Sequence, residues 1–201
     1  MNLELENLPN LRALLEGSHV HSDNLEKLLE YWIQNRQPIV QAIYQAGRFL
    51  DIGCANGFLL VCLMRWNDFQ IIPYGIDIDE HSINAARVLL PEYPNHFVQV
   101  PLEHFFVPSN FGFPEDFDYV YWCVWDGLDF HEPLCQTFAE NAFGAARAGG
   151  RVILGFYDTD HECVKRQLEW LVDRFGTYSA ILKLDVVFAW WDCGLRVETD
   201  R

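Results

Sequence analysis

The sequence predicts an α/β protein with a doubly wound, mainly parallel seven-stranded sheet. Three observations support this fold class. Apolar segments with strand composition alternate with helical patterns from residue 48 onward. The first of these segments ends in a small-residue turn at 51–57. The second ends at Asp77, which lies 24 positions after Gly53. In doubly wound folds, a glycine turn and an acid at this spacing hold a ligand outside the carboxyl ends of the strands.

The elements follow one another in the order that such a fold needs. Short apolar runs with β-branched and aromatic residues indicate strands, and longer runs with apolar residues three and four positions apart indicate helices. Strand and helix alternate, which predicts helices on both faces of the sheet. The predicted strands are 48–53, 71–77, 96–100, 117–122 and 151–157, and the predicted helices are 58–66, 80–90, 133–148 and 161–175. We expect Gly149 and Gly150 to end the third of these helices and to lead into the fifth strand.

Residues 1–47 precede the sheet and have helical patterns of their own. Asp23 is expected to cap a helix that starts with the run 24–31, and a second helix is expected after Pro38. The apolar positions of both runs fall at helical spacing, so these faces should pack on the rest of the protein.

Length and composition fit one domain over residues 1–201. With 50% hydrophobic residues the chain can bury a core, and no apolar run approaches the roughly 20 residues of a membrane span. The acidic start lacks the basic and apolar regions of a signal peptide, so a cytoplasmic protein is expected. Six cysteines include no C-x-x-C pair and no zinc-like cluster, which predicts reduced thiols and no metal.

The charge balance narrows the class of partner. With 14 basic and 29 acidic residues, the formal net charge is −15, which repels polyanions. Transfer RNA, ribosomal RNA and DNA are therefore poor candidates for the substrate. The sequence predicts a small-molecule partner and no membrane, and it leaves the oligomeric state open.

The turn at 51–57 and the segment 75–77 resemble motif I and the acidic strand-2 motif of the class I S-adenosylmethionine-dependent methyltransferases. Two rival nucleotide sites fit less well. The nicotinamide fingerprint G-x-G-x-x-G is absent, because Gly53 is followed by Ala55 and Phe58 where that pattern needs glycines. The sequence also contains no Gly-Lys-Ser/Thr phosphate loop.

The resemblance implies S-adenosylmethionine as the cofactor and covers residues 48–192. It implies that Asp51 faces the ammonium group of the cofactor, that Asp77 accepts from the ribose hydroxyls, and that Ile78 lies under the adenine. It further implies that 178–184 and 186–191 form the sixth and seventh strands, the last inserted antiparallel between strands five and six. The residues expected to contact the cofactor are Asp51, Gly53, Cys54, Ala55, Gly57, Asp77, Ile78, Leu102, Glu103 and Trp122.

The third family motif departs from the usual pattern. The family commonly carries a Gly-Asp pair after strand three, and its carboxylate accepts from the adenine amino group. Here Pro101 stands at that position, and Glu103 is the nearest replacement. A solvated loop glutamate is an equally good reading of Glu103, because glutamate side chains are mostly exposed.

Acceptor recognition is expected in the loop after strand four. Residues 122–131 include two tryptophans, two aspartates and one histidine. Aromatic rings bind planar or cationic groups, and Asp126 or His131 could remove a proton from the acceptor. The N-terminal segment is a second candidate, as a lid that carries His19, His21, Tyr31 and Trp32. The predicted catalytic residues are Asp126 and His131, and the predicted substrate contacts are Trp125, Trp32 and His21.

The sequence therefore predicts methyl transfer from S-adenosylmethionine to a small apolar or aromatic acceptor. Two alternatives stay open. Aminopropyl transfer on the same fold is disfavoured, because a polyamine needs a denser acidic channel than Asp126 and Asp129 provide in that loop. A catalytically silent cofactor-binding module or regulatory partner would account for the altered third motif.

Overall fold

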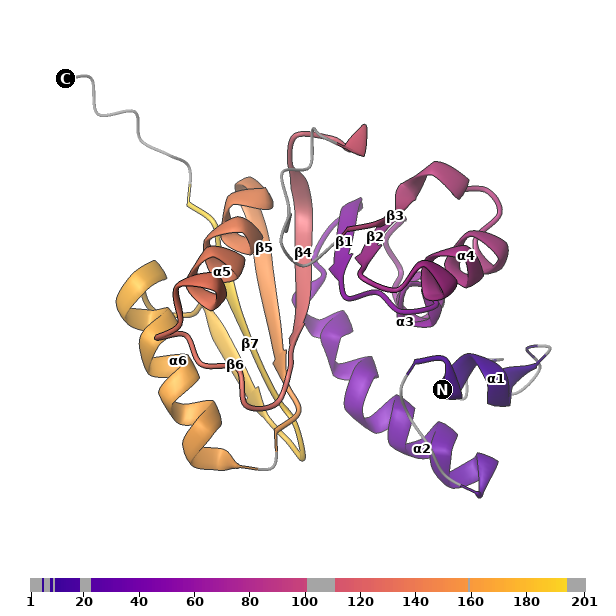
Figure 1. The fold of residues 1–201 in the computed structure, drawn as a ribbon, viewed down its shortest axis with the longest axis horizontal. Coiled ribbons are helices and arrows are strands. Elements are labelled where there is room, and N and C mark those ends of the chain that lie inside the picture. Colours follow the sequence, from indigo (N-terminus) through magenta and orange to yellow (C-terminus); the bar gives the residue numbers. More distant parts are fainter. Residues whose placement is uncertain are drawn as a thin grey trace. The chain divides into compact units, whose positions relative to one another are not determined.

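The computed structural model describes residues 5, 8, 10–18, 23–100, 111–158 and 160–194 (Figure 1). The chain divides into two units, Met1–His104 and Phe105–Arg201. The expectation of a single domain over residues 1–201 stays a prediction. Within the described residues, no helix combines the length and apolar character that a bilayer-spanning segment needs.

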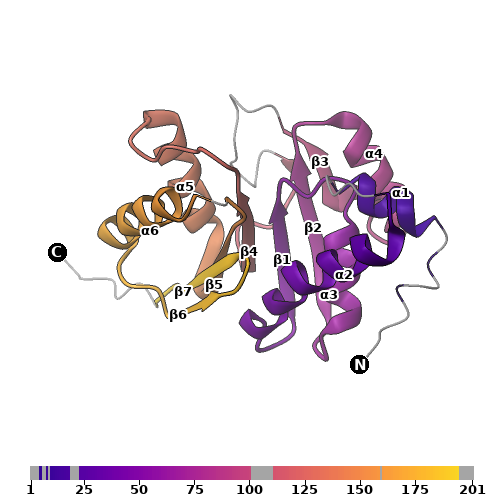
Figure 2. The ribbon, with the colours of Figure 1, turned by 90° about the horizontal axis from the view of Figure 1, so that it is seen from below.

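The first unit is built on three parallel strands, β1 (Gly47–Ile52), β2 (Ile71–Asp77) and β3 (Phe97–Gln99), in the spatial order β3, β2, β1. Between them run α3 (Phe58–Trp66), α4 (Glu80–Leu89) and the 3₁₀ helix η3 (Pro94–His96). Helix α3 packs on β2, and α4 packs on β2 and β3, beside the strands as Figure 2 shows. Strands β1 and β2 are thus each followed by a helix, and the turns after them emerge at the same edge of this sheet.

The N-terminal part of this unit comprises α1 (Leu11–Glu16), α2 (Leu25–Arg36) and the 3₁₀ helix η2 (Gln37–Ala42). Two details differ from the sequence prediction. The cap of α2 is Asn24, whose side chain accepts from the Lys27 N–H, and not Asp23. The segment after Pro38 is a 3₁₀ helix and not a new α-helix, because it continues directly from α2 with the proline in its first turn, where an N–H is not needed.

The second unit contains β4 (Phe117–Val124), β5 (Ala146–Phe156), β6 (Ala180–Lys183) and β7 (Val187–Asp192), in the spatial order β4, β5, β7, β6. Strands β4 and β5 are parallel, and β7 is antiparallel to both β5 and β6. The predicted insertion of the last strand between the fifth and sixth is confirmed. Helices α5 (Pro133–Ala145) and α6 (His161–Phe175) complete the unit (Figure 1), and Phe143 of α5 stacks on Phe175 of α6 with ring centroids 3.7 Å apart.

The role predicted for Gly149 and Gly150 is wrong. Helix α5 ends at Ala145, and both glycines lie inside β5. They fall where the register against β4 jumps, because Phe117 pairs with Ala146 but Tyr119 pairs with Arg151. Gly149 has φ +77°, and a Cβ at Gly150 would lie 2.9 Å from the carbonyl oxygens of Phe117 and Asp118. The glycines therefore permit a bulge and a close approach of two backbones.

The α/β fold class with seven strands is confirmed, three strands lying in the first unit and four in the second. Burial of the central strands explains why the sequence predicted them. All four residues from Phe49 to Ile52 are buried, and seven of the eight residues of β4 are buried. Strands covered on both faces read as continuous apolar runs and not as alternating ones.

Candidate cofactor and acceptor sites

The turn after β1 has the open backbone that a close ligand contact requires. The N–H groups of Gly53 and Cys54 both donate to the Ile76 carbonyl oxygen, at 2.8 and 3.0 Å. Gly53 has φ +76°, and a Cβ placed on it would meet nothing within 4 Å. The turn is therefore anchored to β2 on one side, while the space beside Gly53 is free for a ligand.

Asp77 ties this turn to the end of β2. Its Oδ2 accepts from the Ala55 N–H at 2.8 Å, and its Oδ1 accepts from the Asp79 N–H at 2.9 Å. Ala55 has φ +47°, a rare conformation for a residue with a side chain, and this hydrogen bond helps to hold it. A carboxylate has about four lone-pair sites, so Asp77 can accept two ribose hydroxyls without losing either backbone bond.

Asp51 lies buried beneath the turn, with 2% of its surface exposed. Burial, and secondarily the neighbouring carboxylate of Asp77, raise the pKa of Asp51 to about 8, while the Arg36 guanidinium acts in the opposite direction. At neutral pH the side chain is therefore mostly protonated in the free protein. An ammonium group beside it would favour the carboxylate and lower this pKa.

Two other residues predicted to contact the cofactor, Ile78 and Cys54, differ in their exposure to solvent. Ile78 follows Asp77 and exposes 59% of its surface, although it is a large aliphatic residue. Such exposure suits the floor of an adenine site. Cys54 is buried, and burial raises the pKa of its thiol well above the ordinary value, so it stays neutral. Leu102 and Glu103 lie outside the described residues.

Asn56 is a residue of this turn that sequence reasoning missed. Its Oδ1 accepts from the Phe58 N–H at 3.1 Å and from the Ser18 hydroxyl at 2.8 Å, and its Nδ2 donates to the Leu14 carbonyl oxygen at 2.8 Å. The side chain thus binds the start of α3 to the end of α1. The signal available in the sequence was a polar residue between Ala55 and Gly57, directly before a helical apolar run.

The structure removes Trp32 from the candidates for acceptor binding. It is 2% exposed, stacks on Phe58 with ring centroids 5.2 Å apart, and its Nε1 donates to Cys62 Sγ at 3.4 Å. These contacts place the indole in the core, as amphipathic helices usually place their aromatic residues. Tyr31 on the same helix is 49% exposed. His19 and His21 lie outside the described residues.

In the second unit, the two tryptophans after β4 have different environments. Trp122, expected at the cofactor, is only 1% exposed, and its ring packs edge-on against Trp125 and Phe130. It is a core residue, because β4 is buried almost throughout. Trp125 rests on Phe138 but keeps 42% of its surface exposed. Of the two indoles, Trp125 is the one available to an acceptor.

The candidate bases both lie on the surface of the loop after β4. Asp126 and His131 are exposed, and the His131 N–H donates to Asp129 Oδ1 at 2.9 Å. A cavity of about 340 Å³ adjoins this loop and includes His131 but not Asp126 in its lining. The structure therefore brings His131 to a cavity and leaves Asp126 beside it on the open surface.

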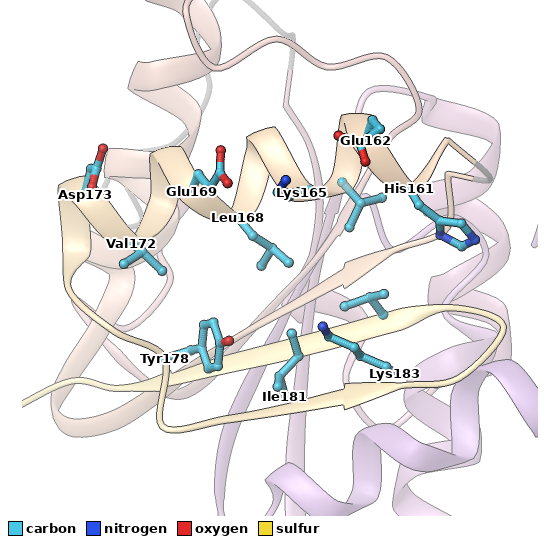
Figure 3. A pocket seen from close by; sticks show the side chains of 12 residues that line it. His161, Glu162, Lys165, Leu168, Glu169, Val172, Asp173, Tyr178, Ile181 and Lys183 are labelled. Atoms are coloured by element: carbon cyan, nitrogen blue, oxygen red, sulfur yellow. The ribbon is translucent and has the colours of Figure 1, made fainter.

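A larger cavity, of about 570 Å³, lies between α6 and the β6–β7 hairpin (Figure 3). Its floor is aliphatic, with Leu168 and Val172 facing Ile181. Its lining also carries both charge signs, with Lys165 and Glu162 on α6 and Lys183 on the hairpin. Sequence reasoning named no site here. None of the residues predicted to contact cofactor or acceptor belongs to its lining.

Comparison with known proteins finds similar folds among solved structures but no similar sequence. The sequence matches no family model and no curated protein sequence. Among solved structures, the chain is similar to the PH0226 protein from Pyrococcus horikoshii OT3, with 18% identity, a TM-score of 0.59, and coverage of 83% of this chain and 92% of the other.

Two enzymes are similar over comparable lengths. One is the N-methyltransferase NodS from Bradyrhizobium japonicum WM9 in complex with S-adenosyl-L-homocysteine, with 16% identity, a TM-score of 0.59, and coverage of 90% and 97% of the two chains. The other is the ribosomal protein L11 methylase from Lactobacillus delbrueckii subsp. bulgaricus, with 12% identity, a TM-score of 0.52, and coverage of 77% and 74%. The chain therefore has the fold of the class I S-adenosylmethionine-dependent methyltransferases, as its motifs predicted.

Proposed function

We propose that this protein transfers a methyl group from S-adenosylmethionine to a small acceptor with an apolar or aromatic body. One observation carries the proposal. The glycine turn after β1 and the acid that ends β2 form a single hydrogen-bonded unit, through the 2.8 Å bond from the Ala55 N–H to Asp77. Free space beside Gly53 adjoins that unit. It has acceptors and room for a nucleoside carrying an amino acid.

The residues present fit this cofactor. Asp51 would face its ammonium group, Asp77 would accept from its ribose hydroxyls, and the exposed Ile78 would contact its adenine. A diphosphate fits less well, because the turn contains an acidic residue, Asp51, and lacks the glycine spacing of a dinucleotide fingerprint. When bound, the sulfonium group supplies an already activated methyl group. The protein has to align the acceptor, exclude water and, for a protonated acceptor, remove a proton.

The loop after β4 supports the choice of a small acceptor. Trp125 offers an accessible aromatic surface, and His131 borders a cavity of about 340 Å³, a size that suits a small molecule. Similar structures act on different acceptors by name, including a ribosomal protein. The acceptor is therefore argued from this loop and from the net charge of −15, which disfavours nucleic acid.

A turnover screen tests the proposal. The purified chain is incubated with S-adenosylmethionine and a panel of small phenols, amines, thiols and carboxylates, and release of S-adenosylhomocysteine is followed by mass spectrometry. We expect release with at least one acceptor class, and loss of that release in Asp77→Ala. If the chain binds the cofactor but no acceptor gives product, the regulatory-module alternative is the better account.

A further inference from the structure

The cavity of about 340 Å³ in the second unit lies where β4 and β5 end. Its walls come from the loop after Val124, from the loop after Phe156 and from the first turns of α6. The two loops are joined, because the Gly127 N–H donates to Asp158 at 3.3 Å. Ligands of doubly wound folds bind outside the carboxyl ends of the strands, and this cavity occupies that position for two neighbouring parallel strands.

One buried polar side chain in this cavity has an unused acceptor. Gln167 is 4% exposed, and its Nε2 donates to the Leu128 carbonyl oxygen at 2.7 Å. Because that carbonyl can only accept, the amide nitrogen must face it and the Gln167 oxygen must point away from it. Among the described residues, none donates a hydrogen bond to this oxygen, and Gln167 lines the cavity. A ligand N–H or O–H placed there would satisfy it.

The charges around the cavity are mostly negative. Asp129, Asp158 and Asp160 contribute three carboxyl groups, against one guanidinium from Arg166. Hydrogen bonds from the backbone N–H groups of Asp160 and Gly127 lower the pKa of Asp158, so this group is a carboxylate at neutral pH. An excess of carboxylates favours a cation over a neutral or anionic ligand.

An aromatic pair gives the cavity an apolar side. Phe130 stacks on Trp170 with ring centroids 4.9 Å apart and an angle of 12° between the ring planes. Trp170 is only partly buried and lines the cavity. An indole face binds both apolar groups and organic cations.

We propose that this cavity binds the methyl acceptor as a cationic amine with an apolar or aromatic body. This inference rests on the proposed methyltransferase function and names its acceptor class. The ammonium group donates to the Gln167 oxygen and faces the carboxylates of Asp129 and Asp158, while the body of the acceptor lies against Trp170. For transfer, the nitrogen gives one proton to water and its lone pair forms the N–C bond. The C–S bond breaks with its electron pair going to sulfur, which leaves an N-methylammonium product.

Binding to the full chain without methyl donor tests the inference separately from turnover. The probes are 2-phenylethylamine, 2-phenylethanol and 3-phenylpropanoate, which share a body and differ in charge, and their dissociation constants are measured by calorimetry. We expect the amine to bind most tightly and the carboxylate most weakly. Equal affinities for the three probes would overturn the inference.

Charge variants at the exposed rim sharpen the test, since they leave the core intact. Asp129→Asn keeps an acceptor for the His131 N–H and removes one charge, so the dissociation constant of the amine should rise about threefold. Arg166→Gln removes a positive charge and should lower the dissociation constant of the amine by about the same factor. Neither change should alter binding of the alcohol. Asp173→Asn, on the same helix but outside this cavity, is the matched control and should change nothing.

Turnover with the same probes separates the two proposals. If a neutral acceptor is methylated while amines neither bind nor react, the amine inference is wrong and the methyltransferase function stands. If the chain fails to bind S-adenosylhomocysteine and methylates no probe, the proposed function is wrong, whatever the amine affinities show. Variants that shift the affinities of all three probes alike would show a structural effect and contradict the inference.

Discussion

The Ala55 N–H donates to Asp77 Oδ2 over 2.8 Å, so the glycine turn after β1 and the acid at the end of β2 form one unit before any ligand arrives. The same carboxylate also receives the Asp79 N–H at the start of α4. Asp77 thus holds the shape of the site and keeps lone pairs for the ligand. Loss of its charge should affect both functions.

Replacement of Asp77 by alanine should weaken binding of S-adenosylhomocysteine by about 1.5–3 kcal/mol, the range for hydrogen bonds to a charged group. Asp77→Asn should lose less binding free energy than Asp77→Ala, because its amide oxygen can still accept from one backbone N–H. Calorimetric titration measures both. The exposed Asp68 of the same unit provides the control, and Asp68→Ala should bind normally. An unchanged dissociation constant in Asp77→Ala would place the ribose acid elsewhere.

Gly53→Val should abolish cofactor binding, because the new side chain would enter the free space beside the turn and would be strained at φ +76°. Gly112→Val is a matched control, since Gly112 has φ +72° and equally open surroundings. Both variants should lose stability, but only Gly53→Val should lose cofactor affinity. Wild-type affinity in folded Gly53→Val would show that this turn is not the site.

Cofactor binding should release protons near neutral pH. The pKa of Asp51 is raised to about 8 in the free protein, so the group is mostly protonated below pH 8, and an ammonium partner lowers that pKa. Affinity should therefore increase as the pH rises toward 8 and decrease again where the ligand's own ammonium group loses its proton. Calorimetry in buffers of different ionisation enthalpy measures the released protons, and Asp51→Asn should remove this release.

The raised pKa of Asp51 also makes the free energy of unfolding depend on pH. Between the ordinary carboxyl pKa of 3.8 and about 8, the folded state holds a proton on Asp51 that the unfolded state has lost. The contribution of Asp51 is present in full below the lower value and decreases as the pH rises through 8. The difference in unfolding free energy between Asp51→Asn and wild type should therefore grow with pH across this window. A pH-independent difference in denaturant titrations would contradict the assigned pKa.

Acceptor recognition in the loop after β4 can be separated from folding. Trp125→Phe and His131→Gln change exposed residues, so they should lower turnover or raise the acceptor KM, while Tm and cofactor affinity stay near the wild-type values. Trp122→Ala removes a buried indole and should cost about 3–5 kcal/mol of unfolding free energy. If Trp125→Phe and His131→Gln both turn over normally, the acceptor site lies outside this loop.

The hydrogen bonds of the Asn56 side chain should stabilise α1 against local unfolding. Asn56→Ala removes the bonds to Ser18 and Leu14, so amide hydrogen exchange in α1 should become faster while exchange in β1 changes little. Ser18→Ala removes the Ser18 bond and should have a smaller effect. Equal protection of α1 in Asn56→Ala and wild type would show that apolar packing alone holds the helix.

The sequence predicted the elements of the sheet more accurately than the side chains at the site. Helices α3 and α6 and strand β2 have the predicted bounds, because their apolar periodicity is strong and caps such as Asp160 mark the ends. Gly149 and Gly150 were misread because a bulge depends on the partner strand, which local sequence does not show. Trp122 and Trp32 could not be told from ligand contacts for a similar reason, since their burial is set by residues distant in the chain.

The site residues that follow a fixed sequence spacing could be predicted. The turn with Gly53 and Gly57 and the acid Asp77 carry fixed spacing, so their proximity could be expected from a parallel pair of strands. The partners of Asn56 are some 40 positions away, and the unpaired oxygen of Gln167 emerges only from the packing of α6 against the loop at Leu128. Such contacts need the tertiary structure.

Calorimetric titration of the purified chain with S-adenosylhomocysteine, NAD and ATP tests the central claim most directly. We predict saturable binding of S-adenosylhomocysteine with one site per chain and no binding heat from NAD or ATP, because the turn beside Asp51 and Asp77 suits an amino acid and a ribose and not a pyrophosphate. Saturable binding of NAD with no heat from S-adenosylhomocysteine would contradict the account.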